Sequence, residues 1–77
     1  MMTTEKIKEI AAGIFQLDLS SIRLDMAPDD VDTWDSLNHL RLITEVESSF
    51  SIQLSMQQIQ SIHSLADLVE AVAKAVG

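Results

Sequence analysis

Ser36 occupies the position in this sequence that best suits a chemical role. It belongs to the run Asp-Thr-Trp-Asp-Ser-Leu at residues 32–37, where a long irregular segment is expected to meet the start of a helix. A hydroxyl there is exposed and lies beside backbone N–H groups without partners, at the positive end of the helix dipole. These groups favour an attached phosphate, so a phosphodiester at Ser36 is physically reasonable. Position alone leaves a second interpretation open, in which Asp35 or Ser36 simply caps the helix.

Ser36 and His39 would share one face of that helix, which raises the question of a hydrolase. A catalytic serine needs a base oriented by a third group, and it needs an oxyanion hole. Ser36 lies in no Gly-x-Ser-x-Gly turn, and a chain this short leaves little room for a deep pocket. We therefore expect no enzyme. His39 is interpreted as a solvated side chain, and His63 as a local hydrogen-bonding residue between two helices.

The acidic residues Asp29, Asp30, Asp32 and Asp35 resemble a loose calcium-binding loop. The EF-hand pattern requires a glycine at its sixth position and a glutamate at its twelfth. Counting from Asp30 places Asp35 and Arg41 at these positions, so the pattern fails. The sequence therefore favours a solvated acidic loop and assigns no metal ligands, with a weak divalent-ion site in this loop as the alternative.

Composition and charge restrict the class of protein. The 77 residues suffice for a single domain over residues 1–77, and the formal net charge of −7 argues against binding to nucleic acid. The same charge favours partner proteins with basic patches. Cysteine is absent, so disulfides are excluded and helix packing must stabilise the domain. Residues 1–15 are amphipathic and no apolar run has the length of a membrane span, so we expect a cytoplasmic monomer.

Apolar residues recur at helical spacing in the first half of the chain and predict two helices. Thr3 or Thr4 is a suitable N-cap for the first helix. Its apolar stripe consists of Ile7, Ile10, Ala11 and Ile14. The second helix begins near Ser36, and its apolar face consists of Leu37, Leu40, Ile43, Val46 and Phe50.

Two further helices are predicted in the second half. Ser55 and Gln58 have capping-box spacing ahead of a short helix at about residues 56–59. Ser64 and Asp67 repeat a similar cap before a last helix, whose apolar residues are Leu65, Leu68, Val69, Val72 and Val76.

Residues 17–34 lack helical periodicity and predict a long loop between the first two helices. Its apolar side chains are expected to lie on the core: Leu19, Ile22, Leu24 and Met26. Met26 and Met56 are interpreted as core residues. The predicted fold is an all-α bundle of three longer helices and one short helix. An α+β fold with strands at residues 17–19 and 51–54 is the alternative, which we favour less because two such short strands make a marginal sheet.

The residues around Ser36 resemble the acyl carrier protein family. Asp35-Ser36-Leu37 is similar to the Asp-Ser-Leu signature that precedes the second helix of these proteins. The order of parts is also similar across essentially the whole chain: a helix, a long loop, the signature, a helix ending near Phe50, an extended segment, a short helix and a final helix. The resemblance implies a carrier that catalyses nothing itself.

The resemblance also implies roles for individual residues. Ser36 matches the serine that a phosphopantetheinyl transferase modifies with 4'-phosphopantetheine from coenzyme A, in a Mg²⁺-dependent reaction. Asp35 matches the acid recognised by a basic group of that transferase, and Leu37 matches an apolar residue that docks on acyl-loading and acyl-processing enzymes. The remaining residues expected to contact partners are Trp34, Asn38, Arg41, Glu45 and Glu47. For Trp34, sealing the loop against the bundle is the alternative. The space that shelters an acyl chain would be lined by Leu40, Ile43, Val46, Ile59, Ile62 and Leu65.

The chain departs from carriers of primary fatty acid synthesis in its distribution of acidic residues. Those carriers have a dense acidic second helix after the signature, whereas residues 38–41 here read Asn-His-Leu-Arg. We therefore expect a specialised, free-standing carrier of polyketide, nonribosomal peptide or other dedicated acyl pathways. A carrier of aminoacyl or peptidyl groups is an alternative, although its usual Gly-Gly-x-Ser signature is absent. A plain acidic helical interaction module without a prosthetic group is the other alternative.

Overall fold

The computed structural model of the chain describes residues 2–76, which fold into a small helical bundle. The helices are α1 (Met2–Phe15), α2 (Ser36–Phe50), α3 (Met56–Gln60) and α4 (Leu65–Val76), with two short 3₁₀ helices, η1 (Leu19–Ser21) and η2 (Pro28–Asp30). The predicted bundle of three longer helices and one short helix is confirmed. The described residues contain no strand, so the α+β alternative is wrong. Residues 1 and 77, the ends of the predicted domain, lie outside the described residues.

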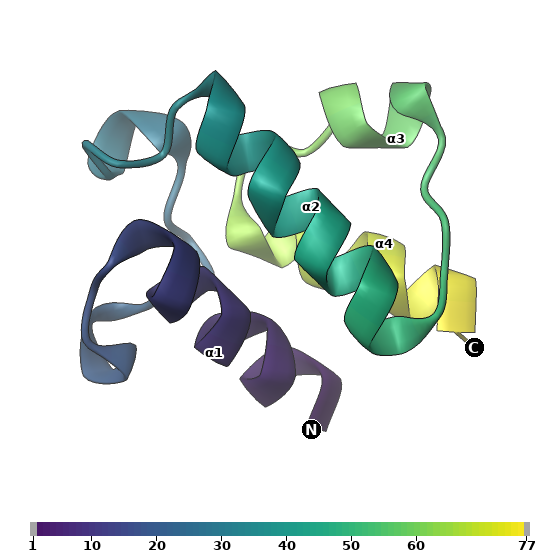
Figure 1. Cartoon of the computed structure of the whole chain (residues 1–77), viewed down its shortest axis with the longest axis horizontal. Helices are drawn as coiled ribbons and strands as arrows, with labels where there is room; N and C mark the ends of the chain where they lie inside the picture. The colour runs from purple at the N-terminus through teal and green to yellow at the C-terminus, as the bar shows by residue number, and fades with distance from the viewer. Residues whose placement is uncertain (1, 77) are drawn as a thin grey trace.

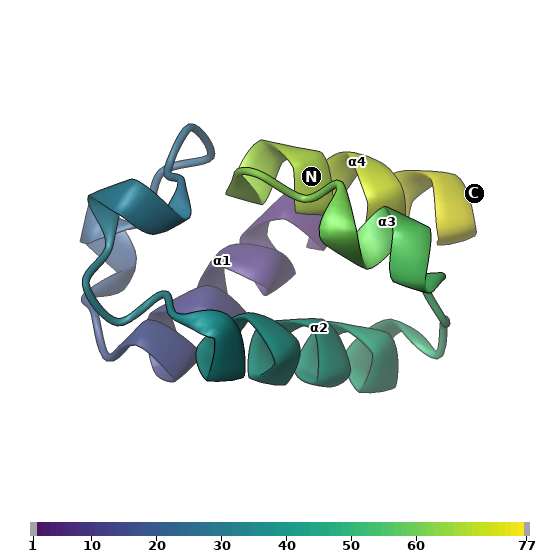
Figure 2. The same cartoon turned by 90° about the horizontal axis from the view of Figure 1, so that it is seen from above.

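The helices surround one core, with the long connection between α1 and α2 at one end. α1 packs against both α2 and α4 (Figures 1 and 2). The α1–α2 connection lies at the left of both views, and the α2–α3 connection lies at the opposite end. The buried side chains come from both the helices and the connection: Ile7, Ala11, Phe15, Ile22, Met26, Val31, Trp34, Leu42, Ile43, Val46, Leu54, Ile62, Leu65, Leu68 and Val72. None of the helices described is long and apolar enough to cross a membrane.

α1 begins at Met2, so the prediction that Thr3 or Thr4 caps it is wrong. Both threonines are half-buried helical residues, and threonine costs a helix at most about 0.7 kcal/mol relative to alanine, which does not prevent the helix from including them. The buried stripe of α1 is Ile7, Ala11 and Phe15, while the predicted Ile10 and Ile14 are half-buried beside it.

Both long helices before α3 end at a residue with left-handed backbone geometry. Gln16 after α1 has a φ of 58°, and Ser51 after α2 has a φ of 56°. At each helix end, the N–H of the following residue bonds to a carbonyl of the last turn. The Leu17 N–H donates to the Ala12 carbonyl and the Ile52 N–H to the Glu47 carbonyl, each at 3.0 Å. These are Schellman-type ends formed without glycine, which is the usual residue there.

The buried face of α2 differs from the predicted face. Leu42, Ile43 and Val46 are buried, whereas Leu37 is 61% exposed and Leu40 is 53% exposed. Phe50, also predicted, is half-buried against the core. Leu42 is buried in place of Leu37 and Leu40 because α1 packs against α2 and the core lies on the side that carries Leu42 and Val46. Periodicity alone does not show which side is covered.

The connection at residues 17–34 packs on the core, as predicted, although not with every expected side chain. Ile22 and Met26 are buried and Leu24 is half-buried, but Leu19 is 52% exposed in η1. Leu19 is exposed because the three-residue turn of η1 interrupts the alternation expected from an extended segment. Val31 and Trp34 supply the remaining buried side chains of the connection.

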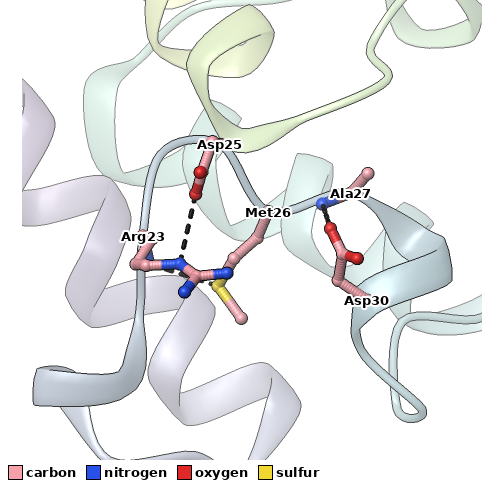
Figure 3. A network of polar contacts seen from close by, with 5 residues as sticks. All are labelled: Arg23, Asp25, Met26, Ala27 and Asp30. Carbon is pink, nitrogen blue, oxygen red and sulfur yellow. Dashed lines mark hydrogen bonds and ion pairs between the residues drawn. The ribbon is translucent and has the colours of Figure 1, made fainter.

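Short-range polar contacts link residues within this connection (Figure 3). Arg23 pairs with Asp25 at 3.2 Å, and the Arg23 N–H points to the Met26 sulfur at 3.1 Å. The Ala27 N–H donates to the Asp30 carboxylate at 3.1 Å.

The connection also supplies hydrogen-bond acceptors for the first turn of α4, where the N–H groups have no partner inside the helix. The Leu65 N–H donates to the Met26 carbonyl at 3.1 Å and the Ala66 N–H to the Leu24 carbonyl at 2.8 Å. The Ser64 hydroxyl accepts from the Asp67 N–H at 3.3 Å, which confirms the predicted cap.

The predicted capping box of α3 is confirmed. The Ser55 hydroxyl accepts from the Gln58 N–H at 3.1 Å, and the Gln58 side chain accepts from the Ser55 N–H at 2.9 Å. Met56 is 65% exposed, so its prediction as a core residue is wrong. Met56 is the first residue of the five-residue α3, and its side chain points mostly to solvent.

Candidate functional site

Ser36 is the first residue of α2 and is exposed. Asp35, and not Ser36, is the N-cap: its Oδ1 accepts from the Asn38 N–H at 2.8 Å. Asp35 has extended backbone geometry, as N-cap residues do, with φ −99° and ψ −176°. The structure thus decides between the two capping interpretations, and among residues 2–76 the Ser36 hydroxyl has no hydrogen-bond partner.

The entrance to α2 is fixed by two side chains on either side of Ser36. The Asn38 side-chain amide donates to the Thr33 carbonyl at 2.7 Å. The Thr33 hydroxyl donates to the Phe15 carbonyl at 2.9 Å, which joins the end of the connection to the end of α1. Ser36 therefore lies at a junction that hydrogen bonds join to both α1 and α2, and not on a free loop.

Trp34 and His39 form a second link at this junction. Trp34 is only 4% exposed, and its ring packs on Phe15 with ring centres 5.0 Å apart. The Trp34 Nε1–H donates to His39 Nδ1 at 3.1 Å, and His39 Nε2 lies 3.3 Å from the Ile59 carbonyl of α3.

These contacts correct two predictions from the sequence. Trp34, expected at a partner interface, instead seals the connection onto the bundle, which was the alternative role. His39, expected to be solvated, is half-buried because it lies between Trp34 and α3. His63 is exposed, and its N–H donates to the Asp67 carboxylate at 3.0 Å.

An open pocket of about 720 Å³ adjoins Ser36. Its lining is mostly apolar. The lining residues come from the connection, from the start of α2, from α3 and from the turn after α3: Pro28, Trp34, Asp35, Ser36, His39, Leu40, Met56, Ile59, Gln60 and Ile62. Three of the six residues predicted to line an acyl space therefore lie here, namely Leu40, Ile59 and Ile62. The other three, Ile43, Val46 and Leu65, are buried in the core.

The remaining residues predicted to contact partners fall into two groups. Asp35, Leu37, Arg41 and Glu45 are exposed on α2 or at its start. Asn38 and Glu47 are half-buried and hold the fold: Asn38 bonds to the connection, and the Glu47 carboxylate accepts from the Leu54 N–H at 2.8 Å.

Sequence reasoning missed several residues around this pocket. Met56, Pro28 and Gln60 line it but were not predicted to do so. No local signal distinguished Met56, because Leu65 also directly follows an N-cap residue, Ser64, and is fully buried. No local signal indicated Pro28, which reaches the pocket only through the path of the connection.

Two of the acidic residues near Ser36 accept hydrogen bonds from different backbone N–H groups. Asp30 accepts from the Ala27 N–H and Asp35 accepts from the Asn38 N–H. Within residues 2–76 no group of three or more histidine, cysteine, aspartate or glutamate side chains is arranged to hold a metal ion.

Known proteins with similar sequences and structures place this chain in a family. The family model described as "Phosphopantetheine attachment site" matches residues 5–72. The chain is 37% identical to the acyl carrier protein of Onion yellows phytoplasma over 73 residues, which cover 95% of this chain and 96% of that protein. It is 33% identical to the acyl carrier protein of Streptococcus pneumoniae serotype 4 over 75 residues, 96% of this chain and 100% of that protein.

Solved structures agree with the sequence comparison. The holo acyl carrier protein of Geobacter metallireducens has a TM-score of 0.86 and 29% identity, with 99% of this chain and 87% of that chain covered. A putative acyl carrier protein of Mycobacterium tuberculosis has a TM-score of 0.85 and 30% identity, with 94% and 96% covered. The fold, the order of the helices and the match over residues 5–72 agree, and the chain belongs to the acyl carrier protein family, whose members bear phosphopantetheine and are carriers rather than catalysts.

Proposed function

We propose that Ser36 carries a 4'-phosphopantetheine arm and that the chain delivers acyl groups to the enzymes of a biosynthetic pathway. One observation carries the assignment of the residue: Asp35 takes the capping role at the start of α2, so the exposed Ser36 hydroxyl is left without a partner among the described residues. A serine that capped the helix would have to give up that hydrogen bond when modified.

The surroundings of Ser36 fit such an arm. The hydroxyl lies where the partner-free N–H groups and the dipole of α2 favour a phosphate. The pocket of about 720 Å³ opens beside it, and the apolar side chains of Leu40 and Ile59 in its lining suit a thioester-bound acyl chain. When attached, the arm supplies a terminal thiol, which the cysteine-free chain lacks.

The exposed residues around Ser36 suit protein partners with basic patches. Asp35 is the acid we propose the phosphopantetheinyl transferase recognises, because its carboxylate is exposed next to the hydroxyl to be modified. Leu37 is 61% exposed and offers an apolar contact on the adjacent residue. A net charge of −7 speeds the encounter with a basic partner at low salt.

The test is to incubate the protein with coenzyme A, Mg²⁺ and a permissive phosphopantetheinyl transferase, and then to measure its intact mass. In this reaction the Ser36 oxygen forms a phosphodiester, the pyrophosphate bond of coenzyme A breaks, the adenosine bisphosphate part leaves and the hydroxyl proton is released. We expect a single phosphopantetheine increment, which peptide mapping places on Ser36.

Two serine variants make this test specific. Ser36→Ala should fold and take no increment, because Asp35 still caps α2. Ser48→Ala is the matched control: Ser48 is exposed on the same helix, and this variant should be modified like the wild type. An increment on Ser36→Ala would refute the site. No increment on the wild type, while a known carrier is modified in parallel, would favour the plain interaction module.

We also propose that the pathway is a specialised one and not primary fatty acid synthesis. Residues 38–41 contain no acid, and of the two acids further along α2, Glu47 is bound to the Leu54 N–H. Arg41 adds a positive charge to the exposed face of α2. A malonyl transferase of primary fatty acid synthesis should therefore load the modified chain much more slowly than it loads its own carrier. Equal rates at low salt would contradict this proposal.

A further inference from the structure

One exposed face of α2 begins directly after Ser36. Its members lie at helical spacing along α2 and are all exposed: Leu37, Leu40, Arg41, Thr44 and Glu45. Together with the half-buried Ile14 of α1 they line an open depression of about 380 Å³. These five exposed residues are called the Leu37 face below. An enzyme that acts on a group attached to Ser36 has to approach the end of the molecule where this face begins.

The Leu37 face is apolar near Ser36 and charged further along the helix. Leu37 and Leu40 form its apolar part, and burying such exposed side chains against another protein is favourable. Arg41 follows with a positive charge, and Glu45 follows one turn later with a negative charge. The order of chemistry along the face is therefore apolar, basic and then acidic.

The charge of Arg41 is available to a partner. Among residues 2–76 Arg41 forms no ion pair, whereas Arg23 of the connection is paired with Asp25. Glu45 lies four positions after Arg41, but a base that precedes its acid at this spacing forms the weaker kind of helical pair. Residues 38–40 contribute no acid, and Arg41 is the one lysine or arginine in α2.

A local positive charge can discriminate between partners that the whole molecule attracts equally. The net charge of −7 draws any basic protein toward this chain, so it does not distinguish one basic enzyme from another. Distinction needs a group that opposes the wrong partner. A docking surface that is basic throughout would bring a like charge against Arg41, which is unfavourable at close range.

We propose that Arg41 selects the acyl-loading enzymes of this carrier. It repels docking surfaces that are basic throughout, and it pairs with a carboxylate on the enzyme that fits. The inference rests on the proposed function of Ser36 and names the chemistry of the partner. That enzyme presents an apolar side chain to Leu37 and Leu40 and a carboxylate to Arg41. Arg41 is thus a specificity-determining residue that contacts the enzyme and not the cargo.

The experiment measures how fast a malonyl transferase with a basic docking surface loads the modified chain. Intact mass first confirms that every protein used carries phosphopantetheine, so the comparison does not depend on the earlier modification step. The malonyl group then moves from coenzyme A to the thiol of the arm: one thioester breaks, another forms, and the thiol proton passes to coenzyme A. Initial rates are measured at low salt and at about 0.5 M salt.

Three variants assign the effect to the charge of Arg41. At low salt Arg41→Glu should be loaded about tenfold faster than the wild type and Arg41→Gln about threefold faster, because the like charge is reversed in one and removed in the other. Both gains should fall to within about twofold at about 0.5 M salt, which screens exposed charges. Lys6→Glu is the matched control, because Lys6 is an exposed base on α1 outside the Leu37 face and this variant has the same net charge as Arg41→Glu. It should be loaded at no more than about twice the wild-type rate.

A reciprocal exchange tests the pairing of Arg41 with a carboxylate. Each basic residue of the transferase docking surface is replaced by glutamate in turn. One of these enzyme variants should load the wild-type chain about tenfold faster than the unchanged transferase does, and it should load Arg41→Glu more slowly than the wild-type chain.

The outcomes separate the inference from the function on which it rests. Equal rates for Arg41→Glu and Lys6→Glu at low salt would overturn the repulsive role of Arg41. A set of transferase variants in which none prefers the wild-type chain to Arg41→Glu would overturn the pairing with a carboxylate. A wild type that takes no arm would refute the proposed function of Ser36, and this inference with it, and the mass spectrum distinguishes that result from the others.

Discussion

Asp35 has two roles that substitution can separate, a structural role in α2 and a proposed role in transferase recognition. Its Oδ1 accepts from the Asn38 N–H at 2.8 Å, which is the capping bond of the helix. Asp35→Ala removes the cap, at a cost of about 0.5–2 kcal/mol. It also removes a negative charge from the positive end of the helix dipole, at a cost of about 0.3–1 kcal/mol. The free energy of unfolding should therefore fall by roughly 1–3 kcal/mol, or about 4–8 °C in the midpoint for each kcal/mol.

Asp35→Asn retains the Oδ1 acceptor and loses the charge alone. Its free energy of unfolding should fall by no more than about 1 kcal/mol, because only the dipole contribution is lost. Loading of Ser36 should nevertheless slow in both variants, since both lack the carboxylate that a basic transferase would meet. This slowing should diminish as salt is added, because the charges are exposed and screened.

The assay combines urea unfolding with initial rates of loading, both at a temperature where all variants are folded. Asp32→Asn is the matched control, because Asp32 is an exposed acid in the same acidic segment and it should change neither quantity much. Equal stability of the Asn and Ala variants would refute the capping contribution. An undiminished loading rate for Asp35→Asn at low salt would refute recognition through the charge.

Two further predictions concern stability. Gly13→Ala should raise the free energy of unfolding by up to about 1 kcal/mol, measured by urea unfolding, because Gly13 is an exposed helical residue and an added Cβ would meet nothing within 4 Å; a loss of stability would contradict this. Glu47→Ala should lower it by about 1.5–3 kcal/mol through loss of the bond to the Leu54 N–H, whereas Glu45→Ala, which removes an exposed acid from the same helix, should stay within about 0.5 kcal/mol. Similar effects of the two glutamate variants would refute a structural role for Glu47.

Features that depend on neighbouring residues in the chain could be predicted from the sequence. The capping box of Ser55 and Gln58, the cap formed by Ser64 and the start of α2 near Ser36 all follow from a side chain that meets a backbone group three residues away. The sequence did not decide whether Asp35 or Ser36 caps α2, because both side chains suit that position. The answer depends on the backbone angles at the junction.

Features that depend on packing could not be predicted in the same way. The apolar residues of α2 are spread over more than one face, and Leu42 is buried while Leu40 is 53% exposed. The covered side is set by the packing of α1 and by the rest of the core, which the sequence of α2 does not contain. Likewise the bond between His39 and the Ile59 carbonyl joins two helices through the folded chain, so no spacing within α2 reveals that His39 is enclosed.

The long connection at residues 17–34 explains how the position of Ser36 is maintained. Its carbonyls at Leu24 and Met26 hold the first turn of α4, while Thr33 holds the end of α1 and accepts from Asn38 of α2. The connection therefore joins all three long helices at the end of the bundle where Ser36 lies. A short turn could link α1 to α2 but could not also reach α4. An arm attached to Ser36 would thus start from a junction held by hydrogen bonds to three helices, and the freedom needed to visit several enzymes would come from the arm.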